Sequence, residues 1–423
     1  MNSYPLPFGN SNIDLHIETD SVIDLILPNH IEPELSGSEI IENAIDYPLK
    51  GIDAFGDLHP GSKVVVTVND KTRPVPNSIL LPPLLKRLAE CGVRQHDICF
   101  IIASGTHIPM RLEEFSHILH PDIVSRFQII AHDCDDEENL YYLGLTPSGT
   151  PVYVNKRFYD ADLRIVVGDI EPHHFAGYSG GVKSASIGCC GRKTINANHT
   201  LLLDPRSTVG RYDDNPLRDD IESIGRMIHV DLSLNAVLDE QKKILGVFFG
   251  RPMDVMREGI KLVNAVSQVP IIEKYHLVIA SAGGYPKDIN LYQSQKAMTH
   301  ASLFCKEGGI ILLAAECREG VGSVGYLNFM KDVSTFEDIN AKFKNQGFSV
   351  GPHKAFQIAR ILEKFTVFLH SSIPDELVKS LLLSPINMND TTMTDLIDKL
   401  PRNGRIAILP YATACIPRLH LED

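Results

Sequence analysis

Short runs of β-branched and other apolar residues alternate along this chain with longer stretches in which apolar residues recur every three or four positions. Runs of the first kind predict buried strands, and stretches of the second kind predict amphipathic helices. In the first part of the chain the predicted strands are KVVVTVND (63–70), HDICFIIASGTH (96–107), FQIIAHD (127–133) and LRIVVGDI (163–170), and LLPPLLKRLAECG (80–92) is a predicted helix. Strands that alternate with helices in this way indicate parallel sheets covered by helices.

The same pattern returns after Pro270, and it predicts a second group of strands. Between the two groups, residues 230–250 differ, because two apolar runs on either side of LDEQKK predict a hairpin. We therefore expect the α/β fold class with two domains, residues 1–270 and 271–423, each with a mainly parallel sheet flanked by helices. The strands predicted in the second group are YHLVIASAGGYP (275–286), GGIILLAAE (308–316), FTVFLHSS (365–372) and RIAILPYA (405–412).

Length and charge narrow the class of protein. A chain of 423 residues that is 43% hydrophobic can bury a large core and exceeds the length of one ordinary domain. The formal net charge of −13 repels nucleic-acid phosphates and anionic lipid surfaces, so we expect no nucleic acid and no membrane as partner. No apolar run approaches the roughly 18 residues of a membrane span. Any anionic ligand must be held by a local group of lysines, arginines or backbone amides.

The N-terminal segment and the cysteines predict a cytoplasmic protein with reduced thiols. The first lysine or arginine is Lys50, so the segment before it lacks the charge of a signal or transit peptide. The eight cysteines are scattered and contain no CxxC pair. The adjacent Cys189 and Cys190 fit a structural role or, alternatively, a redox or metal role.

Polar loops that follow the predicted strands are the candidate site, because ligands of open α/β sheets bind at the carboxyl ends of the strands. Taken alone, Arg73 could be a solvated turn residue and His107 could simply cap a loop. Together the loops predict that cationic and imidazole side chains converge at one edge. The loops are NDKTRPVPN (69–77), SGTHIP (104–109), EPHHFAGYSGGVKS (171–184) and GGYPKDINLYQSQKA (283–297).

The segment 171–184 combines adjacent histidines, several glycines and one lysine. Glycines let backbone amides approach an anion, histidines transfer protons or bind metals, and a lysine can be a nucleophile. The combination suggests a cofactor site, although the spacing is not that of a Walker A motif. If the backbone is extended, His173 and His174 point to opposite sides, so one of the two is expected to be structural.

Five motifs, in order and spread over the chain, resemble the nickel-dependent lactate racemase family: TRPVP, SGTHIP, HHFAGYSGGVKS, KTINANH and GGYPKDINLYQSQKAM. The resemblance implies two α/β domains with the active site between them. It also implies a nickel-pincer nucleotide, a pyridinium mononucleotide with two sulfur-containing arms, tethered to a lysine through a thioamide. Nickel is then held through carbon, sulfur and a histidine. Cofactor-biosynthesis proteins are implied as partners.

The resemblance also implies a role for each matching residue. Lys183 corresponds to the tether, His199 to the nickel ligand, and His107 and His173 to the acid/base pair, which leaves His174 a structural role. Cofactor contacts are implied for Asp70, Thr72, Gly177, Gly180 and Gly181, and substrate contacts for Arg73, Lys296, Gln293 and Tyr292.

The implied function is interconversion of the enantiomers of a small anionic 2-hydroxy acid, most directly lactate. Removing the C2 proton is difficult beside a carboxylate, whereas removing hydride avoids a carbanion. A histidine takes the hydroxyl proton as hydride leaves C2, and the planar 2-keto acid accepts hydride on either face. His353 lies where the lactate enzyme has a tryptophan near its substrate, and a changed pocket wall would change the substrate. Another 2-hydroxy acid is therefore an alternative.

Two hypotheses come from other classes of protein. One is a hydrolase or lyase in which His107, His173 and His199 bind zinc. It predicts zinc in the purified protein and an unmodified Lys183. The other is a nucleotide-sensing module, which predicts ligand binding without turnover.

Overall fold

The computed structural model describes residues 2–17, 19–73, 75–346 and 352–419. The chain folds into two compact units. The central unit comprises residues 30–266, and the terminal unit combines residues 1–29 with residues 267–423. Among the described residues, no helix has both the length and the apolar character needed to cross a bilayer.

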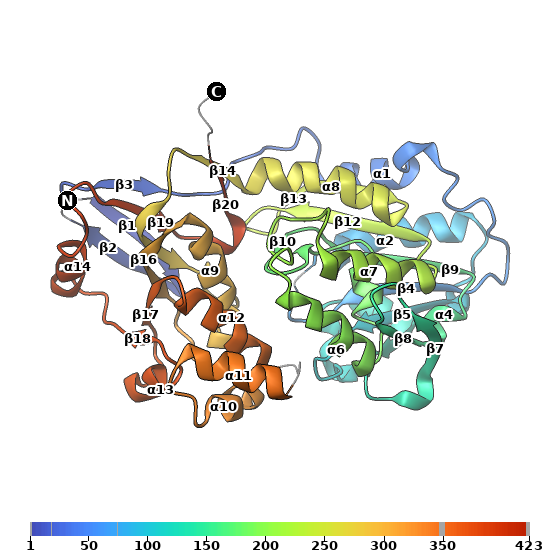
Figure 1. The fold of residues 1–423 in the computed structure, drawn as a ribbon. Coiled ribbons are helices and arrows are strands. Elements are labelled where there is room, and N and C mark those ends of the chain that lie inside the picture. Colours follow the sequence, from blue (N-terminus) through green and yellow to red (C-terminus); the bar gives the residue numbers. More distant parts are fainter. Residues whose placement is uncertain (1, 18, 74, 347–351, 420–423) are drawn as a thin grey trace. The chain divides into compact units, whose positions relative to one another are not determined.

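The central unit is built around a six-stranded sheet with the strand order β13-β12-β9-β4-β5-β6 (Figure 1). Neighbouring strands are parallel except in the β12–β13 hairpin, which occupies the segment predicted to be a hairpin. Every residue of β4 is buried, as expected of a strand covered on both faces. The strands of this sheet are β4 (Val64–Asn69), β5 (Ile98–Ala103), β6 (Gln128–Ala131), β9 (Leu163–Asp169), β12 (Leu232–Leu238) and β13 (Ile244–Gly250).

Helices cover both faces of this sheet because alternate strand residues point to opposite sides. Val64, Val66 and Val68 cluster with residues of α1 and α2, whereas Val65 clusters with residues of α5, α6 and α7. The helices are α1 (Gly37–Asp46), α2 (Asn77–Glu90), α3 (Pro121–Arg126), α4 (Lys156–Tyr159), α5 (Lys183–Ser186), α6 (Arg192–Thr200), α7 (Pro216–Met227) and α8 (Pro252–Ser267). Two small hairpins complete the unit, β7–β8 (Leu140–Leu145, Pro151–Asn155) and β10–β11 (Pro172–His173, Gly177–Tyr178).

Cys189 and Cys190 lie fully buried in the core of the central unit. The Cys189 carbonyl accepts a hydrogen bond from the amide of Asn155 at 2.9 Å, and the Cys190 carbonyl lies 3.0 Å from Nε2 of the buried His132. Burial raises the pKa of both thiols, which keeps them protonated and weakly reactive. These contacts favour the structural alternative for the pair.

The terminal unit holds a second six-stranded sheet, parallel throughout, with the order β18-β17-β16-β15-β19-β3. Val278 and Ala280 of β15 cluster with residues of the helices on one face, whereas Leu277 clusters with Leu6 and Leu15 of the β1–β2 hairpin on the other. The strands are β1 (Asn2–Phe8), β2 (Ser11–Ile17), β3 (Val22–Leu25), β14 (Gln268–Ile271), β15 (Tyr275–Ser281), β16 (Cys305–Ala314), β17 (Thr366–His370), β18 (Ser384–Pro385), β19 (Arg405–Leu409) and β20 (Ile416–Leu419). The helices are α9 (Leu291–Phe304), α10 (Val324–Met330), α11 (Phe336–Gln346), α12 (Pro352–Leu362), α13 (Asp375–Ser380) and α14 (Asp390–Ile397).

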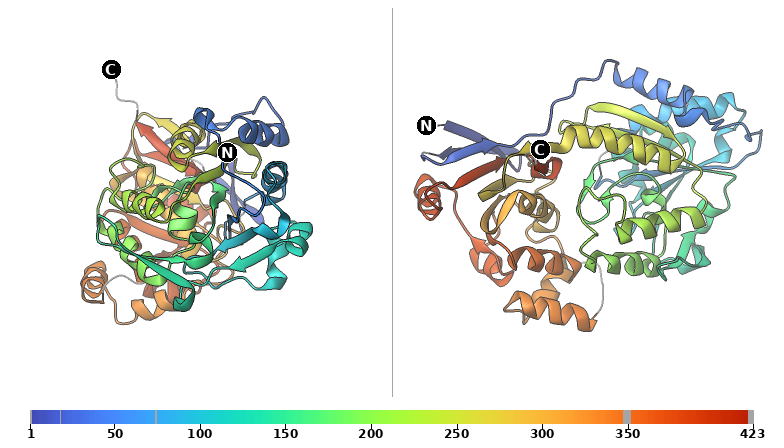
Figure 2. Two further views of the ribbon diagram at one scale, coloured as in Figure 1. Left: turned by 90° about the vertical axis from the view of Figure 1, so that its right-hand side faces the viewer. Right: turned by 45° about the horizontal axis from the view of Figure 1, so that its top comes forward.

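The N-terminal segment departs from the expected division of the chain into residues 1–270 and 271–423. Residues 1–29 pack with the C-terminal segment, and the right-hand view in Figure 2 shows the blue hairpin next to red segments from the C-terminal part of the chain. β3 pairs in parallel with β19, so that Val22 lies opposite Arg405 and Leu25 opposite Ile408. The β1–β2 hairpin also covers apolar residues of β15. Burial of that sheet face therefore stabilises the packing of the N-terminal segment on the terminal unit.

Candidate active site

The loops after β4, β5 and β9 meet at the carboxyl edge of the central sheet, where the sequence analysis places the site. Three contacts join them. Nδ1 of His107 lies 2.6 Å from Oδ2 of Asp70, and a guanidinium nitrogen of Arg73 lies 3.6 Å from the Glu171 carboxylate. The Ser184 hydroxyl donates to the Asn69 side-chain oxygen at 3.4 Å, which brings the start of α5 to the end of β4.

Asp70 holds His107 in one tautomer. The Asp70 carboxylate is buried and also accepts hydrogen bonds from the amide and hydroxyl of Thr72, at 2.9 and 2.6 Å. Burial acts to raise the pKa of Asp70, but the bonds from His107 and Thr72 outweigh it and keep that pKa below its usual range. A carboxylate next to Nδ1 requires the proton on Nδ1, which leaves the Nε2 lone pair to act as a base. Asp70 and Thr72 thus support His107, and their contact with a cofactor stays a prediction.

His173 is buried and has a different partner. Its Nδ1 accepts a hydrogen bond from the amide of Ala176 at 3.2 Å, so the neutral ring carries its proton on Nε2. Its ring stacks on that of His174 with the centroids 4.6 Å apart. The expectation that these two rings point to opposite sides holds for an extended backbone, and that condition is not met, because the chain turns at residues 174–176 between β10 and β11.

Arg73 faces the carboxylate of Glu171, a residue to which the sequence analysis gave no role. The separation of 3.6 Å is a loose ion pair, and both side chains are partly exposed. The backbone of Glu171 is fixed, since its amide donates to the Ser179 hydroxyl and its carbonyl accepts from the Ser179 amide, both at 2.9 Å. The Arg73 guanidinium thus lies where a carboxylate is already accommodated, and a guanidinium can also bind the carboxylate of a ligand.

The glycines of this loop are required by the turn itself. Gly177 has φ +73°, and a Cβ there would lie 1.9 Å from the Arg211 carbonyl oxygen. Gly181 has φ +58°, and its Cβ would lie 2.6 Å from the Met256 side chain. Substitution would strain the backbone and force neighbours to move. Contact of Gly177, Gly180 and Gly181 with a cofactor stays a prediction, because the packing already accounts for glycine.

Arg218 of α7 clamps the glycine loop and was not found by sequence reasoning. This side chain is fully buried, and it donates to the carbonyls of Tyr178 and Gly180 at 3.1 and 3.3 Å. Two further bonds, of 2.9 and 2.6 Å, join it to Glu222 one helical turn away. A buried arginine that uses both a carboxylate and loop carbonyls holds the loop in one conformation.

Lys183 begins α5, directly after the glycine loop, and His199 lies in the last turn of α6. The His199 ring meets the ring of Phe175 edge-on at 5.3 Å, so α6 brings His199 beside the loop that carries His173. α6 is anchored at Asn198, whose amide donates to the buried Asp220 carboxylate at 2.9 Å. The structure thus brings His199 to the His173 loop, and Ser184, next to Lys183, to the end of β4.

In the terminal unit, Tyr292, Gln293 and Lys296 share the first turns of α9. Asn290 caps this helix by accepting from the Gln293 amide at 3.0 Å. The Lys296 ammonium donates to Oε1 of Gln293 at 2.8 Å. The side chains of Gln293 and Lys296 therefore form one polar group, and Tyr292 lies in the same part of the helix.

Asp169, at the end of β9 in the central unit, is a buried carboxyl group that precedes the loop carrying Glu171. Among the described residues no hydrogen bond reaches its Oδ1. Burial, aided by the charge of Glu171, raises the pKa of Asp169 to about 6. A raised carboxyl pKa means that the folded state binds the proton more tightly than the unfolded state. Stability is therefore lost as the pH rises from about 4 through 6.

We expect Asp169→Asn to stabilise the protein at pH 8. Removing the buried charge should raise the free energy of unfolding by roughly 2–3 kcal/mol, the equivalent of about two pKa units. The gain should shrink near pH 5 and vanish below pH 4, where the wild-type carboxyl is protonated. Thermal unfolding of wild type, Asp169→Asn and the exposed control Asp46→Asn across this pH range measures it. A destabilised Asp169→Asn variant at pH 8 would contradict this account of Asp169.

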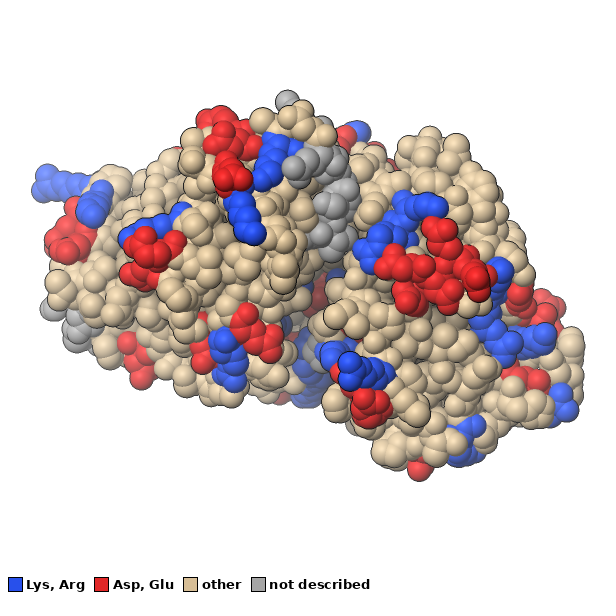
Figure 3. Space-filling model, turned by 90° about the horizontal axis from the view of Figure 1, so that it is seen from below, with Lys and Arg blue, Asp and Glu red and all other residues tan. Residues whose placement is uncertain are grey.

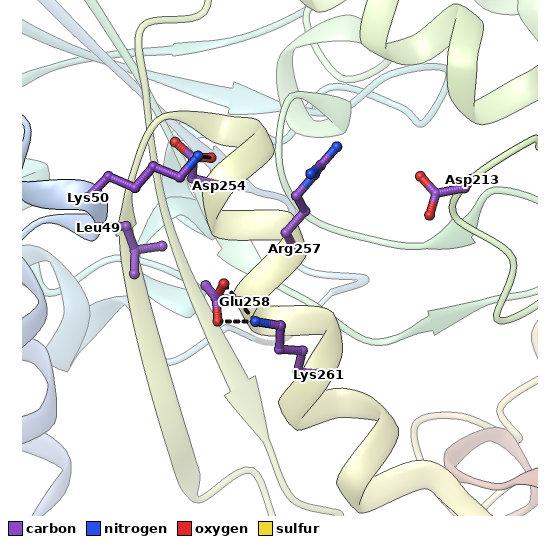
Figure 4. Close-up of a pocket in the computed structure, with 7 residues that line it drawn as sticks. All are labelled: Leu49, Lys50, Asp213, Asp254, Arg257, Glu258 and Lys261. Carbon is purple, nitrogen blue, oxygen red and sulfur yellow. Dashed lines mark hydrogen bonds and ion pairs between the residues drawn. The ribbon is translucent and has the colours of Figure 1, made fainter.

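A separate surface pocket of about 600 Å³ lies along α8 (Figure 4) and is lined by Leu49, Lys50, Asp213, Asp254, Arg257, Glu258 and Lys261. Four of its charged residues form two ion pairs, Lys50 with Asp254 at 2.6 Å and Lys261 with Glu258 at 2.8 Å. Figure 3 likewise shows acidic and basic side chains in small mixed groups on one face. The pocket contains no residue that the sequence analysis selected.

The zinc hypothesis gains no support from the geometry. Within the described ranges, the residues that could share one metal ion are Asp133, Cys134 and Asp135, and not three histidines. Asp135 is already bound by the Arg192 guanidinium through bonds of 2.6 and 2.7 Å. A carboxylate occupied in this way is a poor metal ligand.

The fold and the candidate site define an α/β protein in which titratable side chains gather at the carboxyl ends of parallel strands, where ligands of open α/β sheets bind. Family models for the lactate racemase N-terminal domain and C-terminal domain match residues 8–210 and 272–416. The chain belongs to the lactate racemase family, and it is an enzyme of the racemase class.

Individual relatives agree with this assignment. The chain is 30% identical over 427 residues to the lactate racemase of Thermoanaerobacterium thermosaccharolyticum, which covers 99% of this chain and 100% of that protein. It is 32% identical over 412 residues to the lactate racemase of Lactiplantibacillus plantarum, covering 95% and 96% of the two chains. The lactate racemase apoprotein structure from T. thermosaccharolyticum superposes with a TM-score of 0.89 at 29% identity, over 99% of this chain and 100% of that one.

Proposed function

We propose that this enzyme interconverts the enantiomers of a small 2-hydroxy acid, with lactate as the first substrate to test. The observation that carries the proposal is the pair formed by Asp70 and His107, two residues from different loops, 2.6 Å apart on the strand edge that also presents Arg73. A histidine with a fixed Nε2 lone pair beside a guanidinium suits a substrate that has a hydroxyl group next to a carboxylate.

The residues present fit a nickel-pincer nucleotide. Imidazole nitrogen is a suitable ligand for nickel, and His199 lies against the loop that carries His173. Lys183 follows the glycine loop and offers a primary amine for covalent attachment. When bound, the nucleotide supplies acceptance and return of hydride at C2. Other proteins of the host must make and deliver it.

The side chains of this chain position the substrate and move its hydroxyl proton. Arg73 binds the carboxylate with two parallel hydrogen bonds, and Lys296 adds a second cation. His107 takes the hydroxyl proton at Nε2, and the Asp70 carboxylate stabilises the resulting imidazolium. His173 serves the opposite enantiomer as the second acid/base group. Assignment of the α9 residues to this same active site stays a prediction.

The proposal is tested by assaying nickel-loaded protein from its native host with each pure enantiomer of lactate and of longer 2-hydroxy acids. Chiral chromatography should show both enantiomers approaching equal amounts from either side. Holoprotein with full nickel occupancy that interconverts none of these acids would overturn the proposal.

We expect His199→Ala to lower nickel content and activity together while the fold is kept. A partly exposed side chain near a helix end contributes little to stability, so the melting temperature should change by a few degrees at most. Metal analysis, racemisation assays and calorimetry measure the nickel content, the activity and the melting temperature. His96→Ala, which removes an exposed histidine of the same unit, is the control. Unchanged nickel stoichiometry in His199→Ala would remove His199 from the coordination sphere.

A further inference from the structure

Three residues on one face of α7 contact the segment of residues 178–186, which carries Lys183. Arg218, Ile221 and Gly225 are separated by three and four positions, so they lie on the same side of the helix. Arg218 binds the part of the segment ahead of Lys183, and the other two contact it directly before and shortly after the lysine. The helix therefore holds this segment on both sides of Lys183.

The two contacts that flank Lys183 are close. A Cβ on Gly225 would lie 2.5 Å from Cβ of Val182, so Val182 already packs against the backbone of α7. On the other side of Lys183, the Ser186 hydroxyl donates to the Ile221 carbonyl at 2.9 Å. Val182 and Ser186 are both buried. These contacts restrict the backbone of Lys183 to one position along the helix.

Arg218 binds the carbonyl oxygen to which Lys183 itself is bonded. Nη2 of Arg218 donates to the Gly180 carbonyl at 3.3 Å, and the backbone amide of Lys183 donates to the same oxygen at 3.4 Å. The amide of Gly181 donates to Oδ1 of the buried Asn235 at 2.7 Å. The turn that leads into Lys183 is thus held by one side chain of α7 and one of β12.

The guanidinium of Arg218 is itself held in one orientation. Glu222 accepts two of its hydrogen bonds, at 2.9 and 2.6 Å, and the centre of the Tyr212 ring lies 4.9 Å from its carbon. The Tyr212 hydroxyl donates to the same Glu222 oxygen at 3.0 Å. Burial raises the pKa of Tyr212, which keeps the phenol protonated as this donor. A buried ion pair adds little net stability, because desolvation offsets the attraction. Its hydrogen bonds instead direct the remaining N–H groups of Arg218 toward the loop.

We propose that Arg218 is a positioning residue for Lys183, which holds the glycine loop so that the lysine is presented to the nucleotide in one place. The proposal rests on the proposed function, because it takes Lys183 as the point of attachment. Arg218 acts through the Gly180 carbonyl and the backbone of Lys183, and it needs no contact with the nucleotide. Loss of Arg218 should therefore loosen the loop first and reduce attachment as a consequence.

The first measurement is hydrogen exchange of the full-length apoprotein. In Arg218→Met, the amides of residues 178–186 should exchange about tenfold faster, because a hydrogen bond to a charged group contributes roughly this factor to loop closure. Gly225→Ala should have a similar effect, since the new Cβ displaces Val182 while alanine suits the helix. Arg226→Met, which changes an exposed arginine of the same helix, should exchange as wild type.

The second measurement is the fraction of Lys183 that carries the nucleotide in protein from the native host, determined by intact mass. This fraction should fall about tenfold in Arg218→Met and in Gly225→Ala. Leu84→Ala lowers the melting temperature from the other face of the sheet, and it should keep the wild-type fraction. If Arg218→Met does not fold, the double variant Arg218→Met/Glu222→Gln, which removes both charges of the pair, replaces it.

Two results would overturn the proposal: unchanged exchange at residues 178–186 in Arg218→Met, or a full nucleotide fraction in Arg218→Met and Gly225→Ala despite faster exchange. An equal loss of nucleotide in Leu84→Ala would also overturn it, because the effect would then come from stability alone. Failure of the proposed function gives a different result. Wild type would then carry no nucleotide on Lys183, while the exchange rates would still decide whether Arg218 holds the loop.

Discussion

Lys183→Ala is expected to reduce racemase activity to background and to remove the mass of a covalent nucleotide from the native protein. The amine of Lys183 is the attachment point in our proposal, and alanine offers no atom for the bond. Lys183 is the first residue of the short helix α5, and its side chain is only partly buried. Removing that side chain should therefore leave the fold intact. Intact-mass spectrometry and racemisation assays on protein from the native host measure both outcomes.

Two further variants separate the covalent role from the charge. Lys183→Arg keeps a cation but has no primary amine, so it should be as inactive as Lys183→Ala. Lys193→Ala removes an exposed lysine that pairs with Glu137 at 2.8 Å, and it should keep full activity and the adduct. Wild-type holoprotein that is active with an unmodified Lys183 would show the tether to be wrongly assigned.

The interior strands could be predicted from the sequence because burial on both faces leaves continuous apolar runs. KVVVTVND at 63–70 became β4 at 64–69, and LRIVVGDI at 163–170 became β9 at 163–169. The hairpin within 230–250 was also confirmed. In each case the local pattern alone decides the structure, since a fully buried strand has no polar face to alternate with.

The N-terminal segment could not be placed by the same means. β3 has four residues, and its pairing with β19 joins Val22 to Arg405, nearly the whole chain away. Residue patterns report which face of a strand is buried and carry no information about the partner. The hairpin of residues 2–17 packs on one face of this sheet, and all strands of the sheet except β3 lie beyond residue 274.

Local turns limited what the sequence could say about the site. The Asp70–His107 contact follows from two adjacent parallel strands, so convergence of their loops was predictable. The stacking of His173 on His174 depends on a tight turn that the alternation rule ignores. Arg218 lies on a helix outside every motif, and only the packing reveals that it holds the glycine loop.

The second large loss of racemase activity is expected when an acid/base histidine is disabled, and substitution of Asp70 tests this most sharply. In Asp70→Asn the amide can donate to Nδ1 of His107, which favours the tautomer with its proton on Nε2 and removes the lone pair that the base needs. We expect racemase activity to fall about 10³–10⁴-fold, similar to His107→Ala, with little change in melting temperature. His174→Ala removes the ring stacked on His173 and is the matched control, for which a far smaller loss is expected.

The two histidines should also differ from each other, because their partners differ. The Asp70 carboxylate accepts from Nδ1 of His107 and so leaves the Nε2 lone pair as the base, whereas the amide of Ala176 donates to Nδ1 of His173, whose neutral ring then carries its proton on Nε2. The resting enzyme should therefore oxidise faster the enantiomer whose hydroxyl faces His107. Single-turnover assays with each 2-deuterated enantiomer measure this, and His107→Ala should abolish the faster phase while His173→Ala spares it. Near-wild-type interconversion in Asp70→Asn, or equal single-turnover rates for the two enantiomers in wild type, would contradict the assignment of His107 as the prepared base.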